Sequence, residues 1–149
     1  MPKNCAFTSQ HESSDLAQTH GAPATTGLGL VNGGLQVVNP SASIYEQIQA
    51  RLASPASIDF DFADQSLLSD LFPGRWVPLP YIYNALKFMR QIHKPIWRDN
   101  EVKNLHYLLS PKPWDEEEGK ESQAVHKWWW RVNRERLERE KEQGISDGF

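Results

Sequence analysis

The sequence has little of several features that would place it in a class at once. Cys5 is the only cysteine among 149 residues, which excludes an intrachain disulfide framework and a cysteine-rich zinc site. No run of about 18 apolar residues and no apolar core of a secretory signal occurs. The net charge is only −3, which argues against a nucleic-acid partner held by bulk positive charge. We therefore expect a cytoplasmic protein that binds neither a membrane nor a nucleic acid.

What is present is typical of one globular domain with many aromatic residues. Hydrophobic residues make up 39% of the chain and charged residues 23%, and there are six Trp and six Phe. The spacing of Cys5, His11 and His20 fits no zinc pattern. Composition divides the chain into a flexible segment at 1–27, a central part at 28–115, and an acidic loop with a charged helix at 116–149.

Hydrophobic periodicity predicts a mixture of short strands and helices. Strands are expected over 28–40, which glycines interrupt, and over 102–109. Ser43 and Glu46 have the spacing of a capping box, and Asp61 is a candidate cap for a later helix. The segment from Tyr81 to Tyr83 is compatible with either a helix or an extended chain. Helices are expected over 41–54, 61–72, 81–92 and 122–143.

Three adjacent tryptophans, Trp128, Trp129 and Trp130, lie in the last of these helices. They point in three directions, so they do not share one helical face. The simpler interpretation is that one or two of them dock on the body of the protein. The alternative is a contact for a partner or for carbohydrate.

Four short segments place polar residues where a purely structural chain would not need them. Taken singly, each has a structural explanation. Asn32 suits a turn, and Asp61 and Asp64 suit the start of a helix. Asn84 can satisfy a buried backbone group, and a histidine in a strand, such as His106, is most often a core residue. The segments are Asn32-Gly33-Gly34, Asp61-Phe62-Ala63-Asp64-Gln65, Leu79-Pro80-Tyr81-Ile82-Tyr83-Asn84, and His106 through Lys112-Pro113-Trp114.

In this order, the four segments resemble the C-terminal half of glycosyltransferase family 8, which includes the glycogenins and galactinol synthases. The resemblance covers about residues 28–115, and the amino-acid sequence around the motifs is similar to that of fungal members of the family. It implies an α/β fold of the GT-A type, Rossmann-like and incomplete here at the N-terminus. It also implies that the complete enzyme transfers a hexose from a UDP-sugar to an acceptor, with retention of configuration and dependence on Mn²⁺.

The resemblance also implies a role for each matched residue. Asp64 and Gln65 match residues that hold the donor sugar near the reacting carbon and are the catalytic candidates. His106 matches the histidine that binds the metal, and imidazole is a suitable Mn²⁺ ligand. We expect His106, Lys112, Asp64 and Asn32 to converge on one concave face. The donor and diphosphate candidates are Asn32, Gly34, Asp61, Asn84 and Lys112, whose positive charge would stabilise the leaving phosphate.

Several features depart from the family pattern. The family places Asp-x-Asp upstream as two metal carboxylates, whereas here the similar letters Asp59-Phe60-Asp61 lie downstream of Asn32. Leu109 stands where the family usually has glycine, and Gly33 replaces a small Ala or Ser. We therefore expect weak Mn²⁺ binding and no catalysis by this chain alone. The alternative to a transferase fragment is a non-catalytic binding or regulatory protein, paired with a full-length homologue or with a second copy.

Overall fold

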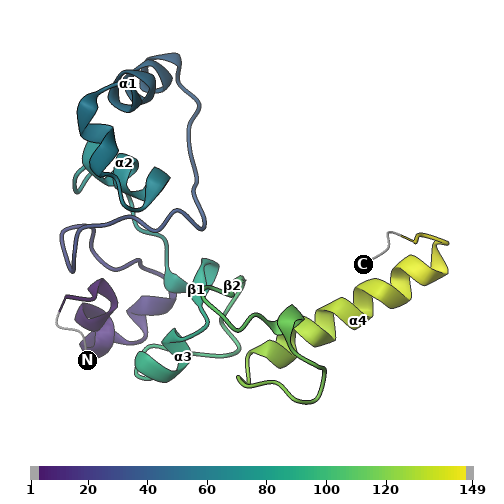
Figure 1. The fold of residues 1–149 in the computed structure, drawn as a ribbon. Helices are drawn as coiled ribbons and strands as arrows, with labels where there is room; N and C mark the ends of the chain where they lie inside the picture. The colour runs from purple at the N-terminus through teal and green to yellow at the C-terminus, as the bar shows by residue number, and fades with distance from the viewer. Residues whose placement is uncertain (1–3, 147–149) are drawn as a thin grey trace. The chain divides into compact units, whose positions relative to one another are not determined.

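A computed structural model describes residues 4–146, and the chain folds as two compact units (Figure 1). The first unit ends at His106 and the second begins at Tyr107. This division differs from the predicted boundaries at residues 27 and 115. No helix in the described part of the chain is long and apolar enough to cross a membrane.

Residues 4–27 pack into the first unit in place of the expected flexible segment. They form two 3-10 helices, η1 (Ala6–Ser13) and η2 (Leu16–Gln18), and Ala17 is fully buried. The Gln18 amide donates to the Ile96 carbonyl at 2.7 Å and accepts from the Tyr81 hydroxyl at 3.0 Å. The composition predicted disorder because large apolar residues are few. Burial of Ala17 and the two hydrogen bonds of the Gln18 side-chain amide nevertheless hold this segment in place.

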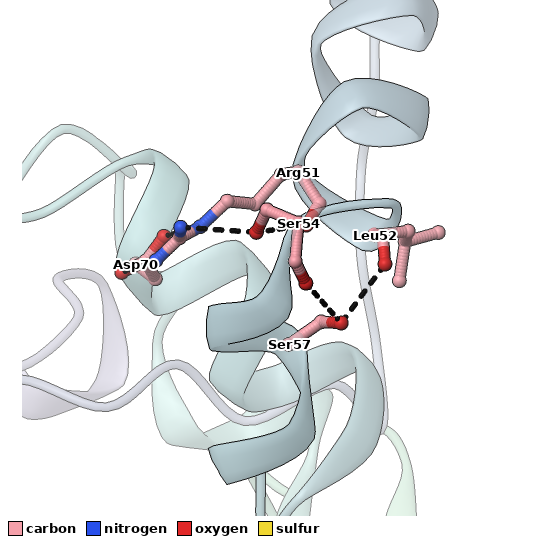
Figure 2. Close-up of polar contacts among 5 residues, drawn as sticks. All are labelled: Arg51, Leu52, Ser54, Ser57 and Asp70. Atoms are coloured by element: carbon pink, nitrogen blue, oxygen red, sulfur yellow. Dashed lines mark hydrogen bonds and ion pairs between the residues drawn. The ribbon is translucent and has the colours of Figure 1, made fainter.

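Two helices of the first unit, α1 (Ala42–Leu52) and α2 (Ala63–Leu71), are joined by an ion pair. Arg51 near the end of α1 donates from Nε and Nη2 to both carboxylate oxygens of Asp70 in α2, at 2.5 and 2.8 Å (Figure 2). The short helix η3 (Pro55–Asp59) follows α1 and leads toward α2. In η3, Ser57 Oγ lies 2.9 Å from the Leu52 carbonyl oxygen (Figure 2).

The expected helix caps are wrong at both helices. Ser41, not Ser43, is the N-cap of α1, and its hydroxyl accepts from the Ile44 amide at 3.4 Å. The N-cap of α2 is Phe62, with no side-chain cap, so Asp61 does not cap this helix. The Phe62 amide instead donates to Ser66 Oγ at 3.0 Å, one turn along α2.

One small parallel sheet organises the rest of the first unit. Its strands are β1 (Ala85–Leu86) and β2 (Leu105–His106), with Ala85 opposite Leu105. The predicted strand over 102–109 is thus much shorter, and 28–40 forms no strand. The predicted helix over 81–92 is divided into η4 (Tyr81–Tyr83), β1 and α3 (Met89–Ile92).

The described residues are therefore rich in helix and hold a single two-stranded sheet. Parallel pairing is compatible with an α/β arrangement, while the GT-A fold stays a prediction. The core beside the sheet contains Ala85, Met89 and Ile96, each fully buried. The neighbouring Tyr81 and Trp97 rings pack with centroids 5.6 Å apart. This core supports the strand ends at which the candidate site residues lie.

The second unit consists of η5 (Pro113–Asp115), an acidic loop and the long helix α4 (His126–Glu142). The prediction of a charged C-terminal helix is confirmed, although it begins at His126. Trp129 of α4 packs against Trp114, with ring centroids 5.9 Å apart. At the base of α4, buried His126 Nδ1 lies 2.7 Å from a Glu116 carboxylate oxygen, and this bond lowers the pKa of Glu116.

Candidate functional site

The Asn32-Gly33-Gly34 loop is held by side chains from two other parts of the first unit. The Gly33 amide donates to Gln65 Oε1 of α2 at 3.0 Å. Asn32 Oδ1 accepts from the Gly34 amide and from Asn84 Nδ2, both at 2.9 Å. Asn84 directly precedes β1, so these bonds connect the loop with both α2 and the sheet.

Both loop glycines pack closely against side chains of other segments. A Cβ added to Gly34 would lie 2.6 Å from Cε1 and 2.7 Å from Nδ1 of the His106 ring. A Cβ on Gly33 would lie 2.4 Å from Asp64 Oδ2. Real Cβ contacts do not come this close, so any side chain here would displace a neighbour. The loop therefore lies directly against the first turn of α2 and the end of β2.

Asp64 lies in the first turn of α2, where the helix dipole stabilises a carboxylate. Its Oδ2 accepts from Gln36 Nε2 at 3.3 Å. Ala63, immediately before it, has φ 44°, a conformation that a residue with a side chain adopts only at a cost. This arrangement presents an exposed carboxylate beside the loop, where it can accept hydrogen bonds from hydroxyl groups.

His106 ends β2, and its backbone carbonyl accepts from the Lys87 amide at 3.1 Å. Its Nδ1 is buried and has no hydrogen-bond partner among the described residues. An imidazole nitrogen of this kind fits one ligand of a transition metal. Residues 4–146 contain no group of three His, Cys, Asp or Glu side chains that could hold a metal. The described residues thus fit one Mn²⁺ ligand and do not form a complete site.

Lys112 belongs to the second unit, so its predicted convergence with the other candidates stays a prediction. Its ammonium donates to the Tyr107 carbonyl at 2.5 Å and lies 5.9 Å from the centroid of the Trp114 ring. The Tyr107 hydroxyl donates to the Val125 carbonyl at 3.2 Å, and burial raises the pKa of Tyr107 to about 12. Because an ammonium has three N–H donors, the bond from Lys112 to the Tyr107 carbonyl leaves donors for a diphosphate.

The first unit brings together six of the residues that the sequence singled out: Asn32, Gly34, Asp64, Gln65, Asn84 and His106. Asp61 is exposed before α2. Sequence reasoning missed Ser69 and Gln36. Ser69 Oγ accepts from the Val31 amide at 3.0 Å, and its position four residues after Gln65 could have placed it on the same helical face. No sequence signal distinguished Gln36. The chemical roles of these residues stay predictions.

Sequence comparison places the chain beside the galactinol synthases. It is 34% identical to galactinol synthase 1 of Solanum lycopersicum over 109 residues, which is 66% of this chain and 33% of that protein. It is 32% identical to galactinol synthase 4 of Arabidopsis thaliana over 118 residues, which is 72% of this chain and 34% of that protein. The chain thus spans about a third of the length of these curated relatives. No protein-family model matches the chain, and no solved structure matches it significantly.

Proposed function

Since this chain is a relative of the galactinol synthases in glycosyltransferase family 8, we propose that its Asn32–Gly34 loop forms part of a donor-sugar site of a hexosyltransferase. The donor is a UDP-sugar, and the acceptor is a hydroxyl compound. The observation that carries this proposal is the double anchoring of the loop: Asn84, beside β1, donates to Asn32 Oδ1, and the Gly33 amide donates to Gln65 of α2. A fixed loop of this kind holds a donor without a large ordering cost.

The groups around the loop suit a sugar. Asp64 and Gln36 are hydrogen-bonded to each other at an exposed position, and hydroxyls of a hexose can replace or extend that bond. Gln65 already accepts from the Gly33 amide, so it positions the loop and offers its amide nitrogen to a ligand. Because glycine has no side chain, Gly33 and Gly34 let the loop backbone lie close to a bound sugar. We infer that Asp64 and Gln65 lie nearest the transferred hexose and that transfer proceeds with retention.

Mn²⁺ would neutralise the diphosphate of the leaving UDP. His106 is the nitrogen ligand that this cluster offers, and the cluster does not supply a set of three ligands among the described residues. We expect His106 alone to bind Mn²⁺ weakly, because tight binding of a metal ion needs several protein ligands. In the second unit, Lys112 is the candidate for a direct contact with the diphosphate.

A second candidate function is binding of the nucleotide sugar without transfer. The observation that favours it is that the described residues hold no group of three metal-ligating side chains, because the loop and Asp64 can hold a sugar without a complete metal site. In this case the chain acts through a partner, either a second copy or a longer homologue.

Thermal unfolding of the full chain with UDP, UDP-glucose and UDP-galactose, each with and without Mn²⁺, tests both functions. A ligand at about 100 times its Kd adds roughly 2.7 kcal/mol to the free energy of unfolding, which is a readable shift. The matched variants are His106→Ala and His20→Ala, an exposed histidine outside the cluster. A metal-dependent shift lost only in His106→Ala supports the transferase site. A shift without metal supports the second function, and no shift with any nucleotide contradicts both.

A further inference from the structure

A second cluster of reactive groups lies in the first unit and shares no residue with the Asn32–Gly34 site. Cys5 Sγ lies 3.3 Å from His93 Nε2. The other ring nitrogen of His93, Nδ1, lies 2.9 Å from His11 Nε2. Residues 88 positions apart in the sequence are thus aligned as a nucleophile, a base and a third group that orients the base.

The central imidazole of this cluster is buried and fixed in place. His93 is only 3% exposed, and it directly follows α3. Its amide donates to the Met89 carbonyl at 2.7 Å, and the Phe7 ring packs edge-on against its ring at 5.8 Å between centroids. Cys5 and His11 are partly exposed, whereas the His93 ring between them is buried.

Two arrangements of protons satisfy both contacts, because either nitrogen of a neutral imidazole can be the donor. In the arrangement that makes His93 a base for the sulfur, the Cys5 thiol donates to His93 Nε2, and His93 Nδ1–H donates to His11 Nε2. This requires a neutral His93 ring. Burial, with a smaller effect of His11, lowers the pKa of His93, so the ring is neutral at physiological pH. Cys5 and His11 are the titratable side chains that contact this ring within the described residues.

We propose that Cys5 is a redox-modification site at which a small hydroperoxide oxidises the thiol, with His93 as the base and His11 as a positioning residue. The thiol proton passes to His93 Nε2, and the sulfur attacks one peroxide oxygen as the O–O bond breaks. With hydrogen peroxide the leaving hydroxide takes the proton back from His93 and becomes water, and with an organic hydroperoxide the leaving alkoxide becomes an alcohol. The sulfur loses two electrons to form sulfenic acid, and the peroxide gains two. Since the chain has one cysteine, no second thiol of the same chain converts this product to a disulfide.

The experiment measures the second-order rate at which hydrogen peroxide oxidises the full chain at neutral pH, with sulfenic acid trapped by dimedone and counted by mass spectrometry. The control carries Cys5→Ser and Ser9→Cys, which moves the thiol to an exposed position of η1. We expect Cys5 to react at least tenfold faster than this control thiol. We expect His93→Gln to reduce the rate to that of the control.

His93→Gln is a substitution of a buried residue, so His11→Gln, at a partly exposed position, provides an independent test. This variant keeps His93 as the base and removes the imidazole that orients it. We expect the rate of oxidation by peroxide to fall several-fold, with the thermal unfolding midpoint unchanged. A Cys5 rate within twofold of the control thiol overturns the proposal. So does a rate that His11→Gln leaves unchanged, or fast alkylation by iodoacetamide without fast oxidation by peroxide.

Discussion

Gly34 and His106 are packed so closely that the loop residue must lack a side chain. A Cβ on Gly34 would stand 2.6 Å from Cε1 of the imidazole, well inside van der Waals contact. The two residues are far apart in the sequence, yet the end of β2 and the Asn32–Gly34 loop meet at this point. The orientation of the His106 ring, and so the direction of its ring nitrogens, depends on the absence of one methyl group.

Gly34→Ala is expected to displace the His106 ring and destabilise the first unit by about 1–3 kcal/mol, the usual cost of overpacking. Gly33→Ala is the matched control, because its Cβ would meet the end of the Asp64 side chain, which is exposed and can rotate away. We expect a cost below about 1 kcal/mol there. Denaturant unfolding measures both costs, and imidazole NMR signals report the ring. Equal costs for the two variants would contradict the close packing at Gly34.

Asn84→Ala is expected to loosen the loop without unfolding the protein. It removes one of the two donors to Asn32 Oδ1 and leaves the bond from the Gly34 amide. Loss of one such hydrogen bond costs about 0.5–1.5 kcal/mol. Hydrogen exchange of the Gly33 and Gly34 amides measures the loosening, with Asn100→Ala, a distant exposed amide, as the control. Unchanged exchange in Asn84→Ala would show that Asn84 does not hold the loop.

The sequence predicted the meeting of Asn32, Asp64 and His106 better than it predicted the elements that carry them. Motif order identified these residues, because the resemblance concerns side chains and not backbone pairing. The strand expected over 28–40 does not form, since the loop amides bond to the Gln65 and Asn32 side chains instead of a neighbouring strand. Local apolar spacing does not reveal such long-range side-chain partners.

The helix expected over 81–92 failed for a similar reason. The Ile82 carbonyl accepts from the amides of Lys103 and Asn104, at 2.8 and 3.1 Å, so it is engaged by a distant segment. The Ala85 amide donates to the Asn104 carbonyl at 2.9 Å and starts β1. By contrast, α4 was predicted closely, because its alternating charges support a helix locally and need no distant partner.

Leu109→Gly is expected to stabilise the second unit. Leu109 has φ 63°, where a residue with a Cβ pays about 1–2 kcal/mol that glycine does not. Leu109 is 64% exposed, so little apolar burial is lost, but glycine makes the unfolded chain more flexible, which offsets part of the gain. A net gain of up to about 1 kcal/mol is expected in denaturant unfolding followed by tryptophan fluorescence. Leu109→Ala shortens the side chain and keeps the strain, so a gain of equal size in that control would refute this explanation.

Acid is expected to weaken the contact between α1 and α2 through Asp70. The hydrogen bond from Arg51 holds the pKa of the Asp70 carboxyl below its ordinary value, against a smaller opposing effect of desolvation. A folded-state pKa below the unfolded value means that the ionised carboxylate favours the folded chain. This contribution is fully present above the unfolded pKa of about 4 and is lost as the pH falls through the folded pKa.

The variant Arg51→Ala removes the cause of that shift. We therefore expect it to lose less stability than the unmodified chain when the pH falls from neutral to about 3, below the ordinary carboxyl pKa. The size of the effect is small, because both side chains are partly exposed and salt screens the pair. Thermal unfolding midpoints across this pH range, at low and high salt, measure the effect. Arg131→Ala, an exposed arginine of α4, is the control and is expected to follow the unmodified chain. Parallel pH profiles for Arg51→Ala and the unmodified chain would show that the pair between α1 and α2 does not form in solution.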